Sequence, residues 1–127
     1  MNKEEIQQII SYAYPKIQKY YGKGILDYPT IDTSHNNTYA LHSGEPEAEG
    51  EHSKTSIAEY LQGTIYLYLP NITNEEELLR ALIHEYTHYT QNSKLFAKYK
   101  AMYDYEDDPT EIEAHRNEED WQMFSLK

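Results

Sequence analysis

The chain has 127 residues and a net charge of −11, from 22 Asp and Glu against 11 Lys and Arg. An acidic surface of this kind repels duplex nucleic acid and anionic membranes, so neither is an expected partner. The length is that of one domain, residues 1–127, and the chain has no apolar run of about 18 residues that would cross a bilayer.

Two further features bear on the cellular compartment. The chain has no cysteine, which excludes disulfides and thiolate metal ligands and fits a reducing environment. Its first residues, Met1-Asn2-Lys3-Glu4-Glu5-Ile6, are acidic and amphipathic, whereas a secretory signal peptide has a basic end followed by an apolar core. We therefore expect a cytoplasmic location.

The first half of the chain predicts one helix followed by strands. Apolar residues at helical spacing predict a helix over residues 2–21, with Pro15 inside it and an end at Gly22. Residues 30–40 and 56–69 favour two or three strands. Between them, residues 45–51 (Glu-Pro-Glu-Ala-Glu-Gly-Glu) are expected to form a flexible acidic loop.

A second strong helix is predicted over residues 75–92. Thr73 and Glu76 fit a capping box, and three glutamates occupy the first turn, where the helix dipole favours them. Six apolar side chains share one arc of this helix: Leu78, Leu79, Leu82, Ile83, Tyr86 and Tyr89. With further helices at 94–103 and 110–122, the pattern predicts an α+β fold.

The 75–92 helix carries the pentapeptide His84-Glu85-Tyr86-Thr87-His88. Residues i and i+4 lie on one face with Cβ atoms about 5–6 Å apart, so both imidazoles can bind one zinc ion at ~2.0–2.1 Å. Glu85 lies about 100° round the helix, where it can take a proton from a water molecule that the metal activates. Histidines on helices are often structural or solvated, but a capped helix after a strand favours the functional interpretation.

Catalytic zinc usually has a third protein ligand, which the later helix can supply. The His-Glu-x-x-His pattern followed by Glu113-Ala114 resembles the gluzincins, the thermolysin-like clan of zinc metallopeptidases, and most of all their small single-domain members. The resemblance covers residues 64–120, and only the pentapeptide is specific. It implies a zincin-like fold, a small mixed sheet packed against the active-site helix and further helices, with one Zn²⁺ per chain bound by His84, His88 and Glu113.

A helical wheel of residues 110–124 also favours Glu113. The mean direction of the apolar residues falls near Glu113 and Asn117, whereas Glu111 and His115 lie on the opposite side. Glu111, His115 and the acidic residues before Pro109 remain alternatives, and a histidine ligand would place the chain in a different zincin clan.

The resemblance also points to supporting residues. Gluzincins of the thermolysin type have an aspartate four residues after the third ligand, which orients the first histidine. Asn117 stands there instead and would orient His84 through its amide oxygen, without the charge. Tyr103 and Tyr105, between the two helices, are candidates to donate a hydrogen bond to the oxyanion of a tetrahedral intermediate.

Together these features predict a zinc metallopeptidase that hydrolyses peptide or protein substrates with Glu85 as general base. In zincins, the strand before the active-site helix borders the cleft, so residues 64–69 are expected to pair with the substrate. Two alternatives stay open. One is a catalytically silent zincin domain that binds a peptide or protein partner, and the other is a latent enzyme whose cleft is filled by residues 121–127. The sequence leaves the cleavage preference and the oligomeric state open.

Overall fold

A computed structural model describes residues 1–36 and 56–126, so the acidic segment at 45–51 lies outside the described residues. The first element, α1 (Lys3–Tyr21), begins with a capping box: Glu5 N donates to Asn2 Oδ1, and Asn2 N donates to the Glu5 carboxylate. It continues through Pro15 and ends at Gly22, whose φ of 85° favours glycine. The predicted helix is confirmed, and its buried residues are Ile6, Ile9, Ile10, Ala13 and Ile17.

The sheet has three short strands in the order β1-β3-β2. β1 (Thr30–Asp32) runs parallel to β3 (Thr64–Leu67), and β2 (Ala58–Leu61) runs antiparallel to it. The β2–β3 turn consists of Gln62 and Gly63, both with positive φ (47° and 89°), which is the geometry of a type I′ hairpin. Because β3 is paired on both sides, the expectation that a substrate pairs with this strand is wrong. Among the described strands the edges are β1 and β2.

The helix that carries the pentapeptide is α3 (Glu75–Thr90), and it begins one residue later than the capping-box pattern predicts. Asn74 is the N-cap, because its Oδ1 accepts a hydrogen bond from Glu77 N at 2.9 Å. Thr73 instead donates its N–H and its hydroxyl to Glu77 Oε1, at 2.9 and 2.7 Å. All six apolar residues predicted to face the core are buried.

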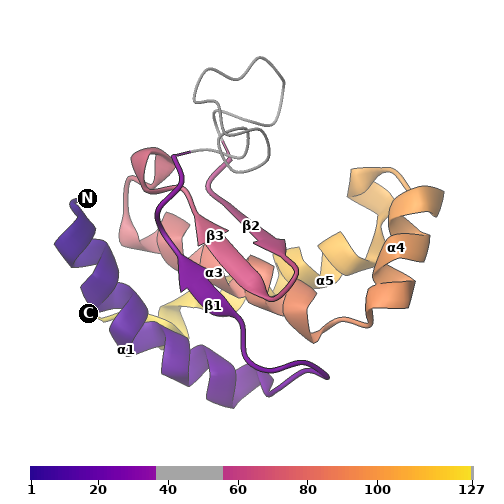
Figure 1. Cartoon of the computed structure of the whole chain (residues 1–127), viewed down its shortest axis with the longest axis horizontal. Coiled ribbons are helices and arrows are strands. Elements are labelled where there is room, and N and C mark those ends of the chain that lie inside the picture. The colour runs from indigo at the N-terminus through magenta and orange to yellow at the C-terminus, as the bar shows by residue number, and fades with distance from the viewer. Residues whose placement is uncertain (37–55, 127) are drawn as a thin grey trace.

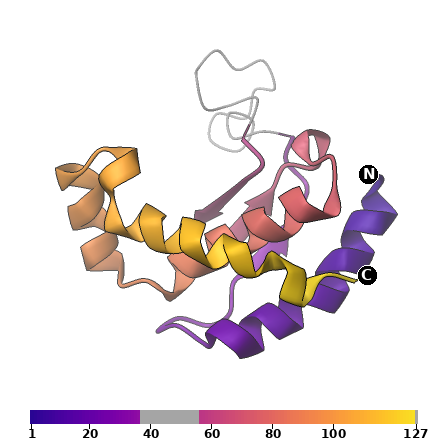
Figure 2. The same cartoon turned by 180° about the vertical axis from the view of Figure 1, so that it is seen from behind.

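α3 lies between the sheet and a C-terminal helix. Figure 1 shows the strands in front of α3, and Figure 2 shows α5 (Pro109–Glu118) and the 3-10 turn η3 (Glu119–Phe124) running along its other side. α4 (Ser93–Met102) has no buried residue and projects at one end, and the 3-10 turn η2 (Tyr105–Asp107) leads from it to α5. The α+β prediction is confirmed. None of the helices in residues 1–36 and 56–126 combines the length and the hydropathy of a membrane span.

The C-terminal tail belongs to the core. Phe124 is buried and contacts the rings of Tyr20 and Tyr21 in α1 at centroid distances of 5.8 and 6.0 Å. Ser125 Oγ and Leu126 N both donate to the Glu75 carboxylate at the start of α3. Glu75 is nine residues before His84, roughly 13 Å along the helix axis. The described part of the tail therefore does not fill a cleft at the pentapeptide, contrary to the latent-enzyme alternative.

Candidate metal centre

The two pentapeptide histidines are buried and face a single carboxylate oxygen from α5. His84 Nε2 lies 2.9 Å and His88 Nε2 lies 3.2 Å from Glu111 Oε1. The two imidazole rings are 4.8 Å apart, as their i, i+4 spacing predicts. The structure thus brings together His84, His88 and Glu111.

Glu113, predicted as the third ligand, does not join this group, and Glu111 occupies the position that faces both histidines. Glu113 Oε1 accepts a hydrogen bond from Gln91 Nε2 at 2.8 Å, and Glu113 lines a surface pocket beside α4. The wheel failed because it counted Ile112 and Met123 as inward-facing, although both are about half exposed, and because it treated residues 110–124 as one α-helix. α5 ends at Glu118, and η3 then winds with about three residues per turn, which turns its apolar side chains away from their projected directions.

The actual inward face of α5 follows from its N-terminus. Asp108 is the N-cap and accepts hydrogen bonds from Thr110 N at 2.9 Å and Thr110 Oγ1 at 2.6 Å. Counting from there, Glu111 and Ala114 are buried against α3, and Glu118 lies one further turn along the same face. Ala114, with no exposed surface, permits the close approach of the two helices.

The outer nitrogens of both histidines also have acceptors. His84 Nδ1 is 2.6 Å from Glu118 Oε2, and His88 Nδ1 is 2.8 Å from Gln91 Oε1. Contacts of this kind fix the tautomer and orientation of a metal-binding imidazole and increase its basicity when the acceptor is a carboxylate. These roles of Glu118 and Gln91 were not predicted from the sequence. Their spacing was a usable signal, because residues three or seven apart lie on the same face of a helix: Glu118 is seven residues after Glu111, and Gln91 is three residues after His88.

Asn117 does not take the orienting role predicted for it. Its Nδ2 donates to Thr87 Oγ1 at 3.1 Å, and its backbone carbonyl accepts a hydrogen bond from the Tyr21 hydroxyl at 3.2 Å. It therefore links α5 to α3 and α1 beside the candidate metal centre, and Glu118 supplies the carboxylate that contacts His84.

Lys100 of α4 contacts the second oxygen of Glu111. Its ammonium pairs with Glu111 Oε2 and lies 2.9 Å from Oδ2 of the buried Asp108. The same ammonium lies 4.9 Å from the ring centre of Phe96 and 5.6 Å from that of Tyr105. Two carboxylates and two aromatic rings thus surround this cation.

The charges of these groups support one another. Burial acts to lower the pKa of His84, but its hydrogen bonds to Glu111 and Glu118 outweigh this and raise that pKa to about 10. For Glu111, burial acts to raise the pKa, but hydrogen bonds from His84, His88 and Lys100 hold it well below its usual range. Glu111 is therefore an anion, the form that binds a metal ion, whereas His84 is a cation that must release a proton when a metal ion binds.

Glu85 lies on the side of α3 that faces the sheet. Its Oε1 accepts a hydrogen bond from the backbone N–H of Tyr60 in β2 at 2.8 Å. Burial raises the pKa of Glu85, and the neighbouring charges of His84 and His88 act in the opposite direction. The predicted base thus lies between the histidines and the edge strand, as its position about 100° round the helix requires.

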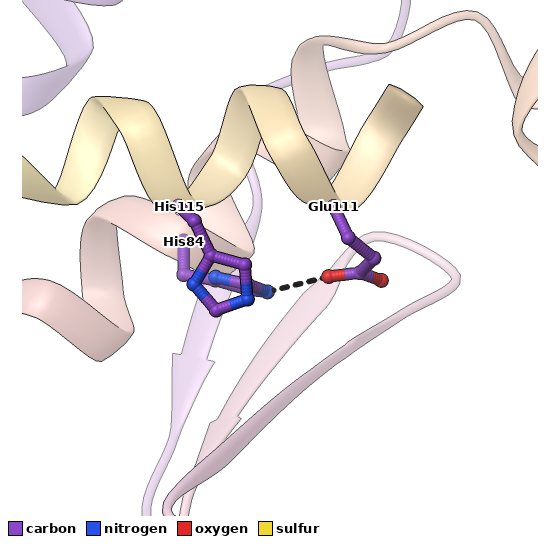
Figure 3. A group of neighbouring side chains, drawn as sticks. All are labelled: His84, Glu111 and His115. Atoms are coloured by element: carbon purple, nitrogen blue, oxygen red, sulfur yellow. Dashed lines mark hydrogen bonds and ion pairs between the residues drawn. The ribbon is translucent and has the colours of Figure 1, made fainter. Parts of the chain in front are cut away.

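His115 lies next to His84 and is exposed to solvent, and Tyr105 contacts His115. The His115 ring lies beside that of His84, with the ring centroids 4.8 Å apart (Figure 3). Its Nε2 lies 2.8 Å from the Tyr105 hydroxyl. Candidate ligand atoms of His84, Glu111 and His115 lie within 4.8 Å of one another, so His115 is an alternative ligand. Tyr103, by contrast, is exposed, and its ring contacts Tyr99.

The donor set fits zinc. Two ligands that each lie about 2.0–2.1 Å from a tetrahedral zinc ion are roughly 3.3 Å apart. The separations from Glu111 Oε1 to the two Nε2 atoms, 2.9 and 3.2 Å, are hydrogen-bond lengths that lie close to that value. Two imidazoles and one carboxylate are also a ligand set of catalytic zinc sites, which keep one position open. His84, His88 and Glu111 would hold the ion.

No family model, no curated protein and no solved structure matches this chain. The resemblance to gluzincins therefore depends on the pentapeptide alone. The Glu-Ala part of the pattern no longer supports it, because the residue after Glu111 is Ile112.

Proposed function

We propose that the chain is a zinc-dependent metallopeptidase with a zincin-like fold and one zinc ion bound by His84, His88 and Glu111. The observation that carries this proposal is the position of Glu111 Oε1, within 2.9 and 3.2 Å of the two Nε2 atoms, while both Nδ1 atoms have separate acceptors. Both Nε2 atoms therefore converge on one anionic oxygen, the arrangement that a shared metal ion needs once the histidines have lost their protons.

The reaction is the hydrolysis of a peptide bond. When bound, zinc lowers the pKa of a water molecule and polarises the scissile carbonyl. Glu85 accepts the proton from the attacking water, whose oxygen forms the new bond to the carbonyl carbon. As the carbon–nitrogen bond breaks, Glu85 passes the same proton to the leaving amine. Of the two tyrosines predicted as donors to the oxyanion, we retain Tyr105, whose hydroxyl lies beside His115.

The substrate strand is proposed to lie along β2. Among the described strands β2 pairs only with β3, and the N–H of Tyr60 points away from β3 toward Glu85. An extended peptide that adds to this edge would bring its backbone beside the general base. This assigns to residues 58–61 the role that the sequence predicted for residues 64–69.

The test combines metal content with a base variant. Purified protein is expected to hold about one zinc per chain, and His84→Ala or His88→Ala is expected to lose it, because two remaining ligands hold the ion poorly. Glu85→Gln keeps all three ligands, so zinc should stay while hydrolysis of a diverse peptide library falls at least ~10²-fold, the usual contribution of a general base. A zinc-replete preparation without metal would contradict the proposal.

One observation favours a second candidate, a silent zincin domain that binds a peptide or protein. Glu85 Oε1 is already engaged by Tyr60 N, so one of the two oxygens of the base is not free for water. If the parent chain binds zinc but hydrolyses nothing in the library, and Glu85→Gln binds peptides as the parent does, this second function replaces the first.

A further inference from the structure

We propose that Lys100 is a positioning residue that restricts Glu111 to binding zinc through one oxygen. The inference depends on the proposed metal centre and adds to it a residue that touches neither the metal nor a substrate. It starts from the division of the Glu111 carboxylate: Oε1 faces the two histidines, and Oε2 is paired with the Lys100 ammonium.

The surroundings of Lys100 hold its ammonium in place. Only 34% of its side chain is exposed, and the ammonium also pairs with Asp108 Oδ2 at 2.9 Å. Asp108 is the N-cap of α5, three residues before Glu111, so its position is set by the same helix that carries the ligand. The rings of Phe96 and Tyr105 flank the cation on other sides. Lys100 therefore connects the otherwise exposed α4 to the start of α5.

The consequence is a defined coordination mode. A carboxylate with two accessible oxygens can bind a metal through both, which adds a ligand and disfavours the tetrahedral geometry that zinc prefers. An ammonium on Oε2 leaves only Oε1 for the metal. Lys100 would therefore limit Glu111 to one donor atom for a bound zinc ion.

Two opposing effects make the prediction sharp. Lys100 is a positive charge beside the expected zinc ion, so Coulomb repulsion alone would make its removal tighten zinc binding. Loss of a residue that orients a ligating carboxylate instead weakens binding, typically by ~10–100-fold. The sign of the change in zinc affinity thus separates a positioning residue from a mere nearby charge.

The experiment compares Lys100→Met with Lys98→Met, which removes the same charge from an exposed position on α4. Zinc affinity is measured by competition with a chromophoric chelator, and expected results are ~10–100-fold weaker binding for Lys100→Met and parental binding for Lys98→Met. Lys100→Arg, which keeps the charge and a donor, should recover most of the loss.

A spectroscopic readout excludes a purely structural effect. With Co²⁺ in place of zinc, the parent should show the intense visible bands of a four-coordinate ion, and Lys100→Met the weaker bands of a five-coordinate one. Lys100→Gln replaces Lys100→Met if circular dichroism shows that the latter does not fold, and is judged by the same criteria. Unchanged Co²⁺ spectra, or tighter zinc binding, in Lys100→Met would overturn the role proposed for Lys100 but not the proposed metal centre. A parent chain that binds neither metal would overturn the proposed function as well.

Discussion

The choice of Glu111 over Glu113 can be tested with two isosteric substitutions on one helix. Glu111→Gln and Glu113→Gln each remove one negative charge, but only Glu111 faces the histidine Nε2 atoms, at 2.9 and 3.2 Å. Four-ligand zinc sites bind with ~10–16 kcal/mol in total, so one ligand contributes roughly 2.5–4 kcal/mol, or ~10²–10³-fold in affinity. We expect a loss of this size for Glu111→Gln. The glutamine at position 113 keeps an acceptor for Gln91, so that variant should bind zinc as the parent does.

Zinc affinity would be measured by chelator competition on protein whose fold has been verified by circular dichroism without metal. The check matters because Glu111→Gln also leaves Lys100 with one partner fewer, and breaking a fully buried ion pair costs ~3–5 kcal/mol. The cost here is expected to be smaller, since the Lys100 side chain is 34% exposed. Loss of zinc in Glu113→Gln with retention in Glu111→Gln would refute the geometry of the site.

Two further predictions address the surroundings of the site and the tail. Glu118→Gln should weaken zinc binding by ~10-fold or more in a chelator titration, because it removes the carboxylate that contacts His84 Nδ1. The control Glu119→Gln changes an exposed neighbour and should leave zinc binding unchanged. Equal effects of the two substitutions would contradict the orienting role of Glu118. Phe124→Ala should lower the free energy of unfolding, measured with urea, by about 3–5 kcal/mol, because the Phe124 ring is part of the core. Peptide hydrolysis should not increase. An increase would support the latent-enzyme alternative instead.

Local patterns in the sequence determined the elements and half of the site. The apolar spacing in α1 and α3 selects the buried faces, because each helix has one stripe of large aliphatic and aromatic side chains. The i, i+4 spacing of His84 and His88, with Glu85 about 100° away, follows from helix geometry alone, so these three positions required no tertiary information.

The tertiary structure decided everything that joins separate elements. Glu111 and Glu113 are two residues apart and lie on different sides of α5. Which of them faces α3 depends on where the helix starts, after Asp108, and where it changes to a 3-10 turn, after Glu118. The weak apolar pattern of α5 does not encode this direction. Lys100 lies on α4 and reaches Glu111 across a helix–helix contact that the sequence cannot reveal.

The sheet edge illustrates the same limit. The sequence correctly predicts a strand at residues 64–67, but their central place in the sheet depends on two pairings. One is with residues 58–61 across a short turn, and the other is with residues 30–32, which are distant in the sequence. Strand order is a property of hydrogen bonds between segments, and side-chain alternation within one segment carries no information about it. The sequence by itself therefore determined the helices, the strands and the relative positions of His84, Glu85 and His88. Packing alone decided that Glu111 faces the two histidines, that Lys100 pairs with Glu111 and that β2 is the edge strand beside Glu85.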